Sequence, residues 1–122
     1  MNPEYFAGFF DGEGCIHVSK QHQLLAVTTQ KQRHVLDLAS QKWGGRLYYV
    51  GANRNSWQWR LSGNEAQGFL MEILPYLIVK QDVAALAIQF QKLKRKGVKT
   101  TPEIVSLEED FKQKISRLNR KD

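Results

Sequence analysis

Two carboxylates, Asp11 and Glu13, stand where a predicted helix meets a predicted strand. The stretch Phe6-Ala7-Gly8-Phe9-Phe10-Asp11-Gly12-Glu13-Gly14 places aromatic and small residues at helical spacing. The next residues, Cys15-Ile16-His17-Val18-Ser19-Lys20, alternate between apolar and polar types, which is typical of a half-buried strand. An acid at this junction lies at the edge of a polar sheet face. Carboxylate oxygens suit a hard divalent cation, and such a cation could be held there over a phosphate backbone.

Composition limits the possible classes of protein. A chain of 122 residues is expected to form one domain, residues 1–122. The formal net charge of +6 and the pI of about 9.6 indicate a polyanionic partner, either nucleic acid or an anionic membrane surface. One cysteine, Cys15, allows no internal disulfide and no zinc site of the clustered Cys/His type.

The expected location follows from the same inventory. No apolar run approaches the ~20 residues of a membrane span. The first residues, Met1-Asn2-Pro3-Glu4, lack the basic region of a secretory signal. We therefore expect a protein of the cytoplasm, the nucleoid or an organellar matrix, without a membrane partner and not secreted.

Hydrophobic periodicity predicts a helix-strand-strand unit followed by a second one. The predicted elements are a helix capped by Asn2 and Pro3, strands near 15–20 and 24–30, a helix closed by Gly44-Gly45, strands near 47–51 and 57–61, a helix with capping-box spacing at Ser62 and Glu65, a helix opened by Asp82 and ended by Gly97, and a helix over about 102–119. All four strands precede the last helices. This order favours an α+β fold, with an antiparallel sheet covered by helices on one face and a core over about residues 2–96.

Gly8 and Gly12 lie four residues apart and therefore share one face of the first helix. An interior glycine costs a helix roughly 1 kcal/mol against alanine. A helix with two such residues is expected to gain something from close approach of another backbone.

Residues 6–14 resemble the signature of the LAGLIDADG homing endonucleases. Three further segments resemble that family in the same order, so that the resemblance spans about residues 4–90: Val27-Thr28-Thr29-Gln30-Lys31, Trp43-Gly44-Gly45-Arg46-Leu47-Tyr48 and Leu74-Pro75-Tyr76-Leu77-Ile78-Val79-Lys80. The resemblance implies an αββαββα fold. Only one motif is present, which in this family implies a homodimer whose motif helices cross, with Ala7, Gly8, Asp11 and Gly12 at the interface.

The resemblance also implies an active site. Phosphodiester hydrolysis needs an activated water and neutralised phosphate charge. By position, Glu13 and the backbone carbonyl of Gly12 would bind Mg²⁺, although the family often has Asp where this chain has Glu13. Mn²⁺ would substitute, and Ca²⁺ would bind without supporting cleavage. Lys80 would stabilise charge on the phosphate, Gln30 would organise water, and Arg33 would contact the scissile phosphate. The alternative for each residue is an ordinary solvated side chain.

One face of the predicted sheet could lie in the major groove, where base edges are distinguishable. Because side chains alternate along a strand, counting in twos assigns one set of residues to this face. The candidate DNA-binding residues are His17, Ser19, Gln21, Thr29, Arg46, Tyr48, Arg54, Gln58 and Arg60. The same parity puts Leu25 and Val27 beside Thr29, where thymine methyl groups could be contacted, and assigns Leu47 and Tyr49 to the core. His17 fits base reading better than metal binding, because no second ligand has suitable spacing.

The sequence thus predicts a Mg²⁺-dependent, site-specific endonuclease that acts as a homodimer on a long, pseudo-palindromic site in double-stranded DNA. Two alternatives remain open on the same fold: a maturase that binds intron RNA, and a DNA-binding protein that does not cleave. The basic runs 92–99 and 112–121 could add phosphate contacts in either case.

Overall fold

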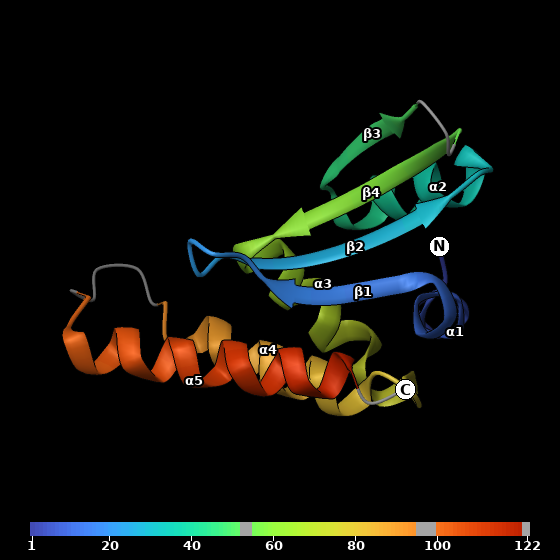
Figure 1. The fold of residues 1–122 in the computed structure, drawn as a ribbon. Coiled ribbons are helices and arrows are strands. Elements are labelled where there is room, and N and C mark those ends of the chain that lie inside the picture. Colours follow the sequence, from blue (N-terminus) through green and yellow to red (C-terminus); the bar gives the residue numbers. More distant parts are fainter. Residues whose placement is uncertain (52–54, 95–99, 121–122) are drawn as a thin grey trace.

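A single four-stranded antiparallel sheet, in the order β1-β2-β4-β3, forms the centre of the computed structural model, which describes residues 1–51, 55–94 and 100–120 (Figure 1). The elements are α1 (Pro3–Glu13), β1 (Gly14–Val18), β2 (Leu24–Gln30), α2 (Arg33–Trp43), β3 (Arg46–Val50), β4 (Ser56–Ser62), α3 (Gly63–Ile73), the 3₁₀ turn η1 (Leu74–Tyr76), α4 (Gln81–Lys92) and α5 (Pro102–Asn119). The predicted α+β order is confirmed.

The core lies between the sheet and the helices that cover one of its faces. Trp59 of β4 is fully buried, and its ring packs edge-on against Phe6 of α1 and Phe69 of α3 at centroid distances of 5.4 and 5.2 Å. The indole nitrogen of Trp59 donates to the carbonyl of Gly44, 2.8 Å away. These aromatic contacts fix α1 against the sheet, and α1 in turn fixes the carboxylates at its end.

Local sequence signals account for several helix ends. Asn2 accepts hydrogen bonds from the amides of Glu4 and Tyr5, and Thr101 accepts one from Ile104, so both predicted caps are confirmed. The capping box of Ser62 and Glu65 does not form, because the Ser62 side chain makes no capping hydrogen bond.

Two other expectations differ from the structure. β1 ends at Val18 rather than Lys20, because Ser19 already accepts the amide of His22 in the turn to β2. Tyr49 is 56% exposed rather than in the core, because β3 is an edge strand. The Tyr49 ring instead packs edge-on against Trp57, at a centroid distance of 5.1 Å, and its hydroxyl donates to Asn55. Gly97 lies outside the described residues.

The other edge strand, β1, is covered by α5 (Figure 1). Asn119, near the end of α5, donates from its side-chain amide to the carbonyl of Ile16 at 2.8 Å. This bond satisfies a backbone group that an edge strand would leave unpaired. None of the helices described here is long and apolar enough to span a membrane.

Candidate active site and nucleic-acid interface

Asp11 joins the last turn of α1 to the segment that leads into α4. One carboxylate oxygen of Asp11 accepts the amide of Ile78 at 2.7 Å, and the other accepts the amide of Lys80 at 3.0 Å. A carboxylate that accepts two backbone N–H groups holds them in a defined geometry. Asp11 therefore orients the loop before α4, which contains Ile78 and Lys80.

Lys80 is brought to the end of α1 by the same contacts. Its ammonium group donates to the backbone carbonyl of Asp11 at 2.5 Å. The charge of Lys80 also affects the thiol of Cys15, on the following strand. Burial raises the pKa of Cys15, and the positive charge of Lys80 partly opposes that rise. The Lys80 ammonium group thus lies beside the junction of α1 and β1. The two residues that it affects, Asp11 and Cys15, each lie two positions from Glu13 in the sequence.

Glu13 is the exposed last residue of α1, and the structure assigns no hydrogen bond or ion pair to its side chain. No group of three or more His, Cys, Asp or Glu side chains in the described ranges could hold a metal ion. A hard cation such as Mg²⁺ does not need such a cluster, because it keeps several waters and often takes one or two carboxylates plus phosphate oxygens. A free carboxylate at Glu13 next to the Gly12 carbonyl fits this mode of binding.

Gln30 lies at the same end of the sheet. Gly14 of β1 pairs with Thr28 of β2, so Gln30 extends two residues past that pair, toward the end of α1. The Gln30 side-chain oxygen accepts the amide of Lys31 at 2.8 Å. Among the described residues, the structure assigns no protein acceptor to its side-chain amide nitrogen.

Arg33 is held in a different way. Its guanidinium pairs with Asp37 one helical turn along α2, at 2.9 Å, and lies 4.5 Å from the centroid of the Trp57 ring. The structure records no contact between Arg33 and either Glu13 or Lys80. A contact with a scissile phosphate would require Arg33 to leave or share these partners.

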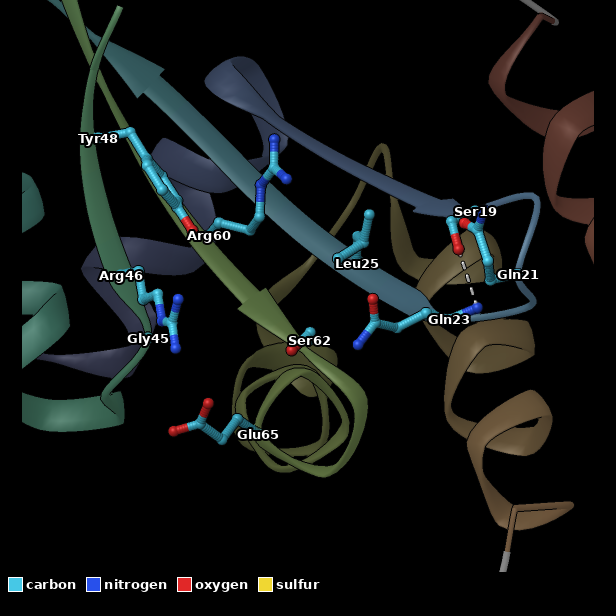
Figure 2. A pocket seen from close by; sticks show the side chains of 10 residues that line it. All are labelled: Ser19, Gln21, Gln23, Leu25, Gly45, Arg46, Tyr48, Arg60, Ser62 and Glu65. Carbon is cyan, nitrogen blue, oxygen red and sulfur yellow. Dashed lines mark hydrogen bonds between the residues drawn. The ribbon is translucent and has the colours of Figure 1, made fainter.

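The open face of the sheet carries the side chains that the sequence assigned to it. Strand pairing places Cys15, Val27, Arg60 and Arg46 in one row across the four strands, and Thr29, Gln58 and Tyr48 in another. A groove of about 670 Å³ lies over this face (Figure 2). Its lining residues are Ser19, Gln21, Gln23, Leu25, Gly45, Arg46, Tyr48, Arg60, Ser62 and Glu65.

Arg60 occupies the centre of this face. Its guanidinium lies 5.5 Å from the centroid of the Tyr48 ring and donates to the Gln58 side chain at 2.9 Å. Burial lowers the pKa of His17, and the positive charge of Arg60 lowers it further. Leu25 and Val27 are on this face as their parity predicts, and each is more than nine-tenths buried. Arg54 lies outside the described residues.

The face of α1 that bears Gly8 and Gly12 is open. A Cβ atom added at either glycine would meet nothing within 4 Å. Ala7 differs from Gly8 and Gly12, because it is fully buried in the core of the chain. Its side chain does not reach the open face of α1. Tyr5, Ile78 and Val79 are 60%, 86% and 66% exposed on α1 and on the loop that Asp11 binds.

Several residues of interest were not identified from the sequence. The exposed pair Ile78 and Val79 has a signal, since both precede Lys80 in an apolar run. Glu65 was interpreted only as a helix cap, yet it lines the groove near Arg46. His22 had no signal, because its partners, Glu108 and Glu109, are more than eighty positions away.

Comparison with known proteins identifies the fold. No family model and no curated protein sequence matches the chain. Among solved structures, the homing endonuclease I-CvuI, in complex with its target in the presence of calcium, matches with a TM-score of 0.82, 22% identity, 98% coverage of this chain and 83% of that one. An archaeal intron-encoded homing endonuclease, I-Vdi141I, complexed with DNA, matches with a TM-score of 0.83, 19% identity and coverages of 98% and 85%.

A third match is the LAGLIDADG meganuclease I-AabMI, bound to uncleaved DNA, with a TM-score of 0.76 and 25% identity. It covers 92% of this chain but only 44% of that protein. The sequence signature at residues 6–14 and these structural matches indicate the same fold. The chain therefore has the LAGLIDADG homing endonuclease fold, with one copy of the motif.

Proposed function

We propose that this protein is a site-specific DNA endonuclease that hydrolyses both strands of a long, pseudo-palindromic duplex as a Mg²⁺-dependent homodimer. The observation that supports this most is the position of Glu13 and Lys80 beside an open, polar sheet face in a chain with this fold. The formal net charge of +6 favours a polyanionic substrate over a neutral one.

Within each protomer, Glu13 and the Gly12 carbonyl would hold the metal ion. When bound, Mg²⁺ would neutralise phosphate charge and help to provide the attacking hydroxide. Lys80, fixed by its bond to the Asp11 carbonyl, presents a positive charge where negative charge develops on the phosphate. Gln30, at the end of β2 that pairs with the start of β1, would orient a water molecule. Asp11 acts indirectly, by holding the backbone of Lys80 in place.

Two protomers would pair through α1. Gly8 and Gly12 leave room for a second helix backbone, and exposed apolar side chains at Tyr5, Ile78 and Val79 border that surface. Burial of these side chains would add to the stability of the dimer. The pairing would bring two copies of Glu13 to one dyad, so that each copy cuts one strand.

The open sheet face would read base edges in the major groove. Arginine pairs best with guanine, which suits Arg46 and Arg60, and glutamine pairs best with adenine, which suits Gln21 and Gln58. Ser19, Thr29, Tyr48 and His17 complete the polar part of this surface. Leu25 and Val27 lie on the same face but are more than nine-tenths buried, so they leave little surface for thymine methyl groups.

A cleavage selection tests the proposal. The protein would be incubated with a randomised duplex library in Mg²⁺, beside a Glu13→Gln variant and a Ca²⁺ reaction. We expect one pseudo-palindromic family of cut ends, absent from both controls. Retention of a specific duplex without cutting would replace the endonuclease with a binding protein. Failure to select any duplex, together with binding of structured intron RNA, would favour the maturase alternative.

A further inference from the structure

The turn between β1 and β2, residues 19–23, has two sides. Ser19, Gln21 and Gln23 line the groove over the open sheet face (Figure 2). His22 contacts α5 instead. The turn therefore connects a surface that would read DNA to a helix that lies outside it.

Each ring nitrogen of His22 faces its own carboxylate. Nδ1 lies 3.0 Å from an oxygen of Glu108, and Nε2 lies 3.1 Å from an oxygen of Glu109. A neutral imidazole has only one N–H and can donate to only one of these acids, whereas an imidazolium donates to both. Both ring nitrogens of His22 are therefore placed to bind acids of α5.

The charges around this ring are nearly balanced. Glu108 is only 5% exposed and also pairs with Lys94, at 3.4 Å. Glu109 approaches Lys112 at 3.9 Å, and hydrogen bonds from Gln113 and His22 lower the pKa of Glu109. Each of the two acids that bind His22 therefore also has a lysine partner.

The backbone at His22 is in an uncommon conformation. Its φ is +59°, in the left-handed region that residues with a Cβ rarely adopt. The turn is closed by the His22 amide, which donates to the Ser19 carbonyl, and by the Gln23 amide, which donates to the Ser19 hydroxyl. Such a conformation persists where surrounding contacts support it, and the bonds to α5 are contacts of that kind.

We infer that His22 is a positioning residue for base recognition: its imidazole ring, clamped between Glu108 and Glu109, fixes the turn that presents Gln21 and Gln23 to DNA. This inference rests on the proposed function. Loss of the imidazole ring should loosen the turn and weaken discrimination at the base pairs beneath it.

The test compares the binding of two DNA duplexes. One duplex is the site recovered from the cleavage selection, and the other differs only at the base pairs under the turn. The ratio of their Kd values is measured in Ca²⁺ for the unchanged protein and for variants of His22. We expect the ratio to fall about threefold to tenfold when the side chain can no longer bind both acids, since a hydrogen bond to the clamp is lost.

Three variants make the test specific. His22→Gln should give the lower ratio. His22→Arg, whose several donors can bind both acids, should keep the higher ratio. His34→Gln, at an exposed histidine on α2, should behave like the unchanged protein. A ratio in His22→Gln equal to that of the unchanged protein would overturn the inference.

A measurement without DNA separates this inference from the proposed function. Amide hydrogen exchange at residues 21–23 should be faster in His22→Gln than in His34→Gln, while exchange in α1 stays the same. Equal exchange rates in the turn would refute the clamp. If the protein selects no duplex at all, the proposed function fails and hydrogen exchange alone decides whether the clamp exists.

Discussion

The two ends of β1 are both tied to a helix through carboxylates, but by different chemistry. At the Gly14 end, Asp11 binds two backbone amides of the loop before α4. At the other end, Glu108 and Glu109 bind the side chain of His22. A backbone amide is present whatever the side chain, whereas a single substitution removes the imidazole ring. The proposed cleavage centre is thus held through the main chain of its loop, and the proposed reading turn through one side chain.

This difference separates two kinds of mutation. A change near α1 is expected to affect catalysis or assembly on every target. A change in the turn is expected to affect only the choice between targets. The predictions below test that separation, in order of decreasing effect.

The largest effect is expected for Glu13→Gln. Loss of the metal carboxylate should lower the cleavage rate on the order of a thousandfold, since a bound metal supplies several kcal/mol of charge stabilisation. DNA affinity in Ca²⁺ should fall far less. Single-turnover cleavage and a binding titration measure the two effects. Glu4→Gln, in the first turn of the same helix, is the matched control and should cleave normally.

Gly8→Leu should block formation of the proposed dimer without destabilising the single chain. Within one protomer the new side chain meets open space, so the free energy of unfolding of the isolated chain should rise by up to about 1 kcal/mol from helix propensity alone. Close helix pairing should be blocked, and cleavage should fall about a hundredfold. Analytical ultracentrifugation measures the assembly. A dimer that persists with unchanged affinity would show that α1 is not the contact.

Asp11→Ala should destabilise the protomer by about 2 kcal/mol, because two amides lose a charged acceptor. The backbone of Lys80 would be released at the same time, so cleavage should fall on every target to a similar extent. Chemical denaturation and cleavage of several targets check both statements. Asp110→Ala, at an exposed position of α5, should change the free energy of unfolding by less than about 0.5 kcal/mol.

The smallest effect is expected for His17. Its pKa is lowered in the folded protein, so the unfolded chain binds the proton more tightly. His17 therefore costs stability as pH falls below the ordinary histidine value, and has no effect well above it. The difference in unfolding free energy between the unchanged protein and His17→Gln should shift in favour of the variant at low pH. A difference that is constant with pH would contradict the cited shift.

Much of the fold could be predicted because its signals are local. Asn2 and Pro3 start α1, Thr101 starts α5, and alternation correctly separated Ile16 and Val18 from His17. Tyr49 was assigned to the wrong environment, because alternation gives the face of a strand but not whether a helix covers it. The capping box was also wrong: spacing permits the bond, yet the Ser62 side chain makes none, and Gly63, the first residue of α3, has a φ of +56°.

The candidate site also has features that local sequence signals predict and features that they do not. The position of Glu13 at the end of α1 follows from sequence order, and so does the open face of Gly8 and Gly12. Ala7 was grouped with those glycines because it belongs to the same motif, yet it faces the core. The role of Asp11 as an acceptor for two amides almost seventy residues away had no local signal.

The sequence by itself determined the elements, their order, the face of each strand and the acid at the end of the motif helix, since all of these depend on residues a few positions apart. Only the tertiary structure decided that Asp11 holds the loop of Lys80 and that His22 meets two acids of α5. The physical reason is that hydrogen bonds act over about 3 Å in space, and no local pattern encodes which distant segments the packed core will bring that close.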